Sequence, residues 1–286
     1  MDFLHHPETD RIILEALRED IGEGDHTTLS TVPRGHTAQA RCIIKDVGII
    51  AGIDLADRIF QLVDPDLVMK RMMKDGDSAT SGQEAFHVIG DPRSILQAER
   101  LVLNFMQRMS GIATASRQVS DAIKDLPCEV LDTRKTTPLI RHMEKWAVQI
   151  GGAVNHRFGL YDMVMIKDNH IDYAGGIPAA VEACKRYLKN HQLELRIEVE
   201  TRNLKEVQEA LMVGGVDVIM LDNMSHQMMA EAVKVIGDQA KTEASGGIQP
   251  EDVRAIALTG VDYISMGYLT HSTPSLDISL KAIRES

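Results

Sequence analysis

From about residue 128 onward, short strand-like runs alternate with helix-like segments, and each strand-like run stops at a polar residue or a glycine. The six runs end at Asp132, Lys167, Glu200, Asp222, Ser245 and Gly267. Strands and helices that alternate every 20 to 35 residues or so predict successive βα units around a parallel sheet, closed or nearly closed into a barrel.

The segments between the last five runs carry helix start signals. Asn203, with Glu206 three residues later, resembles a capping box, and Pro250 stands where a first helical residue belongs. A flat, doubly wound sheet is the runner-up, but the Gly-x-Gly-x-x-Gly turn that usually marks it is absent. The first third of the chain mixes helix-like and strand-like stretches without a regular rhythm, and a long, largely apolar helix is expected from about residue 94 to 125.

Composition argues against several classes of function and of site. A formal net charge of −11 over 286 residues argues against nucleic acid or an anionic membrane as the main partner. No apolar stretch approaches the roughly 18 residues of a membrane span, and the N-terminus does not resemble a signal peptide. The three cysteines fit neither a disulfide framework nor a zinc site, so we expect free thiols and a cytoplasmic protein.

The polar residues at the strand ends form a chemically coherent series. Each has an ordinary alternative, since a lone carboxylate there is more often a helix cap than a metal ligand, and Ser-Gly-Gly can simply be a turn. In a barrel, however, the C-terminal ends of the strands meet at one face, which is where active sites are built. The series runs from cations (Arg134, Lys135, His156, Arg157, Lys167) through acids (Glu200, Asp222) to small residues (Ser245, Gly246, Gly247, Gly267).

This series predicts a site for a polyanionic ligand. The segment 134–167 holds six Lys or Arg and two Asp or Glu, a local net charge of +4 in an acidic protein, which suits several carboxylates or phosphates. Glu200 and Asp222 are hard oxygen ligands of the kind that Mg²⁺ takes. The Ser-Gly-Gly turn at 245–247 precedes a helix and suits a phosphate. Together these features indicate phosphoryl-sugar chemistry.

Seven short motifs make the resemblance specific. "DTRKTTPLIR", "GGAVNHRFGLYD", "IKDNHI", "EVE", "LDN", "SGGI" and "GYLTHS" occur in an order and spacing similar to those of the quinolinate phosphoribosyltransferase family, and "EDIGEGDHTT" resembles its N-terminal signature. The resemblance covers about residues 15 to 280. Leu139 departs from it, because the family usually has glycine there, which affects the local loop backbone and leaves the cations intact.

The resemblance implies a two-domain α/β fold. We expect an N-terminal α/β sandwich domain over 1–110, an open or incomplete parallel α/β barrel over 111–274 that carries the active site, and a final helix over 275–286 that packs back on the first domain. It also implies a homodimer whose active sites lie at the subunit interface.

The implied reaction is the Mg²⁺-dependent transfer of phosphoribose from phosphoribosyl pyrophosphate to quinolinate with decarboxylation, which gives nicotinate mononucleotide in NAD biosynthesis. Lys135, Lys167, Glu200 and Asp222 are the expected catalytic groups, the last two also near the metal. The implied substrate-binding residues are Thr133, Arg134, Lys135, His156, Arg157 and Lys167, with Arg100 donated by the partner subunit. The implied 5′-phosphate site contains Ser245, Gly246, Gly247, Gly267 and His271.

Three other readings stay open from the residues alone. A paralogue could use another acceptor in the quinolinate position. A barrel lyase could form a Schiff base on Lys167, although a lysine among so many cations does not match the apolar pocket that such chemistry favours. A non-catalytic ligand-binding barrel would leave the two metal-type carboxylates beside the basic cluster unexplained.

Overall fold

The computed structural model describes residues 2–283, and the chain divides into two compact units. The first unit contains Met1–Arg117, Thr136–Gly152 and Ser272–Ser286, and the second contains Gln118–Lys135 and Ala153–His271. The chain therefore leaves the first unit and returns to it twice.

The first unit is built on a four-stranded antiparallel sheet. Its order is β12 (Ile278–Ile283), β1 (Ala38–Ile44), β5 (Glu84–Gly90) and β3 (Val68–Arg71), and β2 (Gly48–Ile49) pairs with β4 (Ser78–Ala79) in a separate ribbon. The helices of this unit are α1 (Pro7–Ile21), α2 (His26–Thr31), α3 (Ile53–Val63), most of α4 (Pro92–Ala122) and α5 (Arg141–Gly151).

Apolar residues at helical spacing explain why α3 lies on this sheet. Ile53, Ala56 and Phe60 are spaced three and four residues apart and are buried. Phe60 meets Phe86 of β5 edge to face, with ring centroids 5.8 Å apart. The core of the first unit therefore lies between the sheet and its helices.

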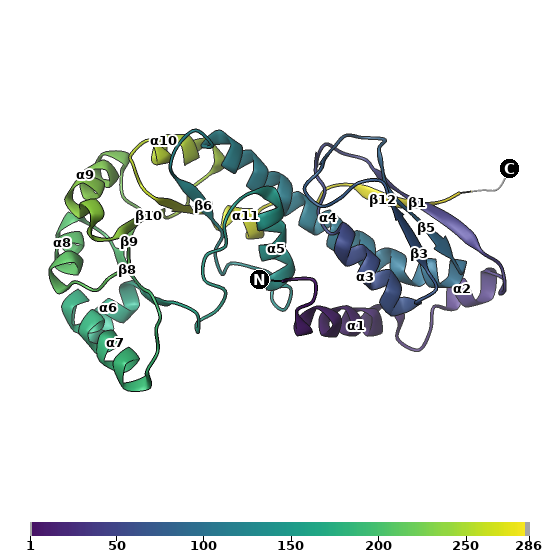
Figure 1. The fold of residues 1–286 in the computed structure, drawn as a ribbon, viewed down its shortest axis with the longest axis horizontal. Coiled ribbons are helices and arrows are strands. Elements are labelled where there is room, and N and C mark those ends of the chain that lie inside the picture. Colours follow the sequence, from purple (N-terminus) through teal and green to yellow (C-terminus); the bar gives the residue numbers. More distant parts are fainter. Residues whose placement is uncertain (1, 284–286) are drawn as a thin grey trace. The chain divides into compact units, whose positions relative to one another are not determined.

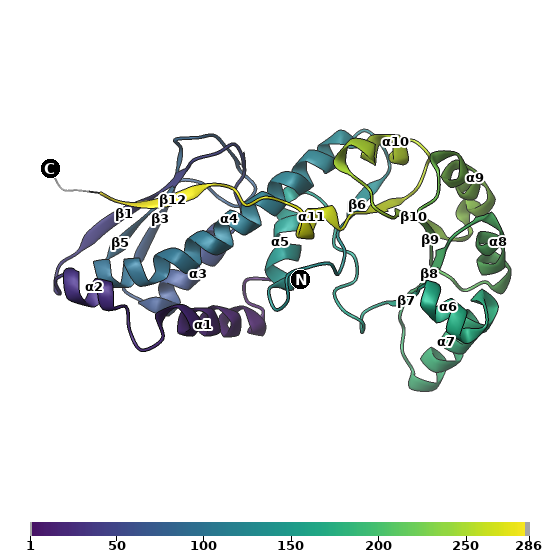
Figure 2. The ribbon, with the colours of Figure 1, turned by 180° about the vertical axis from the view of Figure 1, so that it is seen from behind.

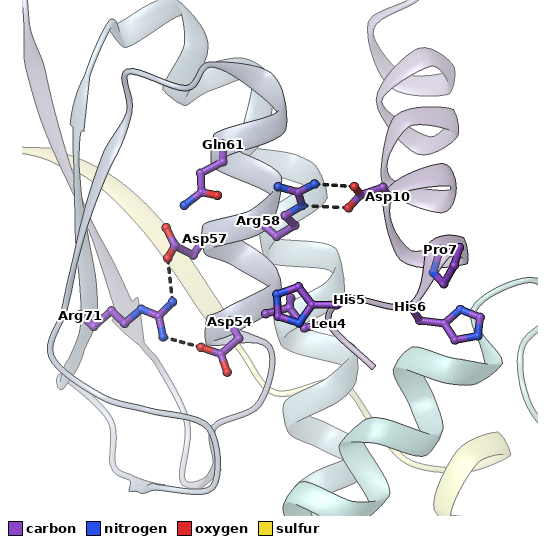
Figure 3. A pocket seen from close by; sticks show the side chains of 10 residues that line it. All are labelled: Leu4, His5, His6, Pro7, Asp10, Asp54, Asp57, Arg58, Gln61 and Arg71. Carbon is purple, nitrogen blue, oxygen red and sulfur yellow. Dashed lines mark hydrogen bonds and ion pairs between the residues drawn. The ribbon is translucent and has the colours of Figure 1, made fainter. Parts of the chain in front are cut away.

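Ion pairs hold α1 and β3 to α3 (Figure 3). Arg58 of α3 forms a two-pronged pair with Asp10 of α1, and Arg71 of β3 bridges Asp54 and Asp57 of α3. The pocket drawn in Figure 3 is thus lined by arginines and aspartates that pair with one another, which is typical of a contact between packed elements.

The second unit contains a six-stranded parallel sheet with helices along its outer side (Figures 1 and 2). Its order is β6 (Glu129–Leu131), β11 (Tyr263–Ser265), β10 (Lys241–Ser245), β9 (Val218–Asp222), β8 (Ile197–Thr201) and β7 (Val164–Ile166). The first strand thus lies next to the last, as in a barrel, but no described strand residue of β6 pairs with β7, so the barrel is open. The helices are α6 (Asp168–Ala174), α7 (Ile177–His191), α8 (Leu204–Val213), α9 (His226–Ile236), α10 (Val253–Ala257) and α11 (Tyr268–His271), with short 3-10 turns at Gly237–Gln239 and Pro250–Asp252.

The fold class expected from the sequence is confirmed. Five of the six strands lie within the expected runs, and β8 extends one residue beyond its run, to Thr201. Asn203 caps α8 by accepting from Glu206 N at 3.1 Å, and Pro250 begins a helical turn. Helices α5 and α6 were not expected. The units also differ from the expected domains, since residue 110 lies inside α4 and 136–152 belong to the first unit.

The expected final helix over 275–286 is wrong for the residues that the structure describes. Ile278–Ile283 form β12, which pairs antiparallel with β1 along its whole length. Ile278 and Leu280 are buried at a spacing of two, and the open edge of β1 offers backbone partners that a helix would leave unused. Residues 284–286 lie outside the described part.

The structure also bears on two expectations from composition, which concern membrane spans and the cysteines. No described helix is long and apolar enough to cross a membrane. The three cysteines are free, and burial raises the pKa of the Cys42 and Cys128 thiols to about 12, so both are neutral at ordinary pH.

Acid is expected to loosen the first unit through His142 of α5. Its Nε2 donates to Thr9 Oγ1 of α1 at 3.0 Å, because the Thr9 hydroxyl already donates to Phe3 O. Burial, with the nearby His6, lowers the pKa of His142 to about 4. Between about pH 6.5 and 4 the unfolded chain binds a proton that the folded chain does not, so stability falls as pH falls, by up to about 3 kcal/mol.

His142→Gln keeps a donor for Thr9 and does not titrate. Chemical denaturation of parent and variant at pH 7 and pH 4 should show a smaller fall in the free energy of unfolding for the variant, because the remaining titratable groups contribute equally to both proteins. Equal losses would contradict this account of His142.

Candidate active site

Strand register places the candidate site residues on one face of the parallel sheet. Glu200 aligns with Met220, and Met220 aligns with Glu243, while Asp222 aligns with Ser245. Side chains two residues apart on a strand share a face, so Glu200, Asp222 and Ser245 all point to the inner side of the barrel. Lys167 follows the end of β7 directly, at the level of Glu200.

Two arginines occupy one part of this side. The Arg134 Nε is buried and has no hydrogen-bond partner among the described residues. Burial, and next the charge of Arg134, lower the pKa of Arg157, whose Nη1 donates to Met163 O at 3.2 Å. Two adjacent guanidinium groups, one with an unused buried nitrogen, favour an anionic ligand.

Lys135 lies in a different group, with Gly267 and His271. A Cβ on Gly267 would lie 2.8 Å from Lys135 Cδ and 2.9 Å from His271 Nε2, so only glycine lets both side chains approach. Thr270 Oγ1 donates to Lys135 O at 2.8 Å, which ties the loop after β6 to α11. The neighbouring cations Arg134 and Lys135 thus belong to two separate clusters.

Lys167 and the acids form a third group. Lys167 Nζ lies 3.6 Å from Glu200 Oε2, with the lysine half-exposed and the carboxylate buried. Burial raises the pKa of Glu200, Lys167 opposes the shift, and Asp222 adds to it. Glu200 and Asp222 repel each other electrostatically, and Lys167 offsets only part of their charge, so the group can accept a further positive charge.

Asn223 was missed by the sequence analysis, although it stands in the quoted "LDN". Its amide donates to Asp222 Oδ2 at 2.7 Å and its backbone N–H donates to Ser245 O, with a φ of +54°. A Cβ on Gly246 would lie 2.4 Å from Asn223 Oδ1. Asn223 therefore orients Asp222 and links it to the Ser-Gly-Gly turn.

His156 lies deeper, with a side chain only 7% exposed. Its Nε2 is 3.0 Å from Glu198 Oε2 and 3.2 Å from Glu243 Oε2, and both glutamates are buried. Its Nδ1 accepts from Arg157 N at 2.6 Å, and its backbone N–H donates to Asp132 Oδ1 at 2.8 Å. Glu198 and Glu243 were not among the residues predicted from the sequence.

His156, Glu198 and Glu243 form a buried triad in which the charge of each group affects the pKa of the others. Burial alone would lower the pKa of His156, but the close contacts of its Nε2 with the Glu198 and Glu243 carboxylates outweigh it and raise that pKa to about 10. A doubly protonated ring conflicts with the hydrogen bond that Nδ1 accepts, and that geometry decides the matter: the ring is neutral, with its proton on Nε2. Burial, and then Glu243, raise the pKa of Glu198, so the three groups take up and release protons as one coupled unit.

The remaining predicted residues lie as follows. Thr133 Oγ1 accepts from Lys135 N at 3.1 Å and shapes the turn after β6. Arg100, on α4 in the first unit, is exposed and forms no ion pair or hydrogen bond with the part of the chain that is described.

Both domains of one family match the chain. Residues 25–110 match the description "Quinolinate phosphoribosyl transferase, N-terminal domain", and residues 112–281 match "Quinolinate phosphoribosyl transferase, C-terminal domain". The chain belongs to the quinolinate phosphoribosyltransferase family.

Relatives of this family resemble the chain over almost its whole length. The "Nicotinate-nucleotide pyrophosphorylase [carboxylating], chloroplastic" of Arabidopsis thaliana is 48% identical and covers 96% of this chain and 84% of its own. The "Probable nicotinate-nucleotide pyrophosphorylase [carboxylating]" of a Synechocystis strain is 45% identical, with 94% and 90% covered. The crystal structure of NadC from Streptococcus pyogenes has a TM-score of 0.91 and 38% identity, covering 97% of this chain and 98% of that one.

Proposed function

We propose that this chain transfers phosphoribose from phosphoribosyl pyrophosphate to the ring nitrogen of quinolinate and releases CO₂, giving nicotinate mononucleotide and pyrophosphate for NAD biosynthesis. The main support is membership in the family across both domains. The gathering of cations, carboxylates and a Ser-Gly-Gly turn on one side of the open barrel agrees with these substrates.

The three clusters suggest a division of labour. Arg134 and Arg157 bind the two carboxylates of quinolinate, since a guanidinium matches a carboxylate with two parallel hydrogen bonds. Lys135 and His271 meet phosphate oxygens beside Gly267, together with the backbone N–H groups of the turn at 245–247.

Glu200 and Asp222 stand where positive charge develops on the ribose. The bond from C1′ to the pyrophosphate oxygen breaks, and a bond from C1′ to the quinolinate nitrogen forms. That nitrogen uses its own lone pair, so the step needs positioning more than a general base. The electron pair left when the 2-carboxylate departs as CO₂ stays on the ring carbon, where the adjacent positive nitrogen stabilises it, and that carbon then takes up a proton from water.

Magnesium fits this arrangement. Glu200 and Asp222 supply hard oxygen donors close enough to influence each other's charge, and Lys167 already offsets part of it. Both carboxylates would hold the ion, directly or through water and substrate oxygens. When bound, Mg²⁺ would offset the negative charge of the departing pyrophosphate.

One assay tests the proposed function. The protein is incubated with Mg²⁺, phosphoribosyl pyrophosphate and either quinolinate or nicotinate, and CO₂ and mononucleotide are measured. We expect equal amounts of both products with quinolinate only. Mononucleotide from nicotinate without CO₂ would favour the paralogue, and a borohydride-trapped adduct that Lys167→Ala abolishes would favour the Schiff-base lyase.

Conservative changes in the acids should affect the metal. Glu200→Gln and Asp222→Asn keep shape but remove charge, so each should raise the Mg²⁺ concentration for half-maximal rate and lower kcat while quinolinate affinity changes little. Mg²⁺ titration and quinolinate binding measure the two effects separately. Weaker quinolinate binding at unchanged Mg²⁺ dependence would place both acids with the arginines.

A homodimer with Arg100 in the partner's site is also part of this proposal, and it is supported by the family resemblance and by an exposed Arg100 that pairs with no acid within residues 2–283. Inactive Arg100→Ala and Lys167→Ala proteins are mixed under conditions of subunit exchange. Each mixed dimer then has one site with both defects and one intact site, so about a quarter of the parent activity should return. No recovery, with exchange proven, would exclude the role across the interface.

The cytoplasmic location stays a prediction. Relatives with similar alignments carry "chloroplastic" or "mitochondrial" in their names, so family membership does not decide the compartment.

A further inference from the structure

Two buried carboxylates on the inner side of the barrel have no part in the proposed reaction. Glu198 and Glu243 are 0% and 1% exposed, and both point to the face that carries Glu200. Both oxygens of Glu198 and Oε1 of Glu243 lack a well-formed hydrogen bond among the described residues. Burying carboxylates without hydrogen bonds costs free energy of folding, so their presence here calls for a structural or functional explanation.

Both carboxylates converge on one imidazole nitrogen. His156 Nε2 lies 3.0 Å from a Glu198 oxygen and 3.2 Å from a Glu243 oxygen. The opposite nitrogen, Nδ1, accepts the backbone N–H of Arg157, which fixes the backbone where the guanidinium begins. Arg157 also lies within the electrostatic reach of Glu198.

We propose that Glu198 and Glu243 are positioning residues for quinolinate binding, which hold the His156 ring between them and so aim Arg157 at the substrate carboxylate. The proposal rests on the proposed function. It gives His156 a role through Arg157 in place of the direct substrate contact that the family resemblance implies.

The same three residues have the composition of a metal site, with ligand atoms within 4.8 Å of one another. The hydrogen bond to Nδ1 argues against that use. Because Nδ1 needs its lone pair for the Arg157 N–H, the ring proton lies on Nε2, the nitrogen that a metal would require unprotonated.

Two carboxylates facing one imidazole predict an unusual pattern in variants. Either glutamate alone can accept the Nε2–H, and methionine has a similar length without an oxygen acceptor. Glu198→Met or Glu243→Met should therefore raise the quinolinate KM by only about threefold, whereas the double variant should raise it by about thirtyfold or more. Each single change also removes like-charge crowding from a buried pair, so stability should stay equal or rise. Affinity and stability would then move in opposite directions.

The test measures the KM for quinolinate, the KM for phosphoribosyl pyrophosphate, and Tm for the parent, both single variants and the double variant. We expect the quinolinate KM to rise more than the product of the single effects, with the other KM within twofold and the single-variant Tm values not lowered. Ile219→Ala, a fully buried residue on the opposite face of β9, is the control, and it should lower Tm without changing either KM.

Three outcomes would overturn the proposal: an unchanged quinolinate KM in the double variant, a KM rise in proportion to lost Tm, or one tightly bound divalent ion in the purified parent that the double variant lacks. An inactive parent would instead refute the proposed function, so the two failures are distinguishable.

Discussion

Arg134→Ala and Lys135→Ala are each expected to lower kcat/KM by about a hundredfold to a thousandfold, which corresponds to about 3 to 4 kcal/mol of lost transition-state stabilisation. The Arg134 Nε is buried and has no hydrogen-bond partner in the described part of the chain, so the site already carries the cost of desolvating a cation that an anionic ligand would offset. Lys135 is held beside Gly267 and His271, where it can reach a phosphate. Removing either side chain leaves a substrate charge uncompensated in a partly dry site.

The two substitutions should differ in which substrate they affect. Because Arg134 neighbours Arg157, its loss should mainly weaken quinolinate binding, and the loss of Lys135 should mainly weaken phosphoribosyl pyrophosphate binding. Steady-state kinetics with each substrate varied in turn measure this. Arg254→Ala, an exposed arginine of α10 paired with Asp125, is the control and should stay within twofold of the parent. Activity within threefold for both site variants would remove "DTRKTTP" from the site.

Glu144→Ala is expected to lower the free energy of unfolding of the first unit by about 3 to 5 kcal/mol. This fully buried carboxylate of α5 accepts from Arg108 of α4 and from both the backbone N–H and the hydroxyl of Thr137. Alanine would leave the guanidinium and a backbone donor without their acceptor, which costs more than the net value of the pair.

Urea denaturation of parent and variant measures this loss. Glu15→Ala removes the partner of Arg18 in an exposed pair on α1 and should cost less than about 1 kcal/mol. If Glu144→Ala cost no more than Glu15→Ala, the interior carboxylate would not stabilise the loop after Lys135.

Much of the second unit could be predicted because a parallel barrel leaves a regular trace in the sequence. Strands of a parallel sheet are largely buried, and function requires polar residues near their C-terminal ends. Asp222 and Ser245 therefore mark the ends of β9 and β10, and Glu200 stands one residue before the end of β8. The same periodicity could have found Glu198 and Glu243, which stand two residues before Glu200 and Ser245 and therefore share their face.

The first unit was harder to predict because its contacts join distant segments. In "SLDISLKAI", Leu276, Ile278 and Leu280 alternate with polar residues as in a strand, while Leu276 and Leu280 also fit a helix. The pairing with β1, more than 200 residues earlier in the chain, decides for the strand. Likewise, no local signal shows that Glu144 accepts from Arg108, because the contact depends on how α4 and α5 pack.

The pairing of β1 with β12 also sets an order for synthesis on the ribosome. Residues 39–44 leave the ribosome more than 200 residues before their partners at 278–283. All strands of the parallel sheet are complete by residue 265, so the second unit can finish folding before the first, although the first unit contains the earlier residues. Until residues 278–283 are made, one edge of β1 stays open to any passing strand, and a nascent chain in this condition is a natural client for chaperones.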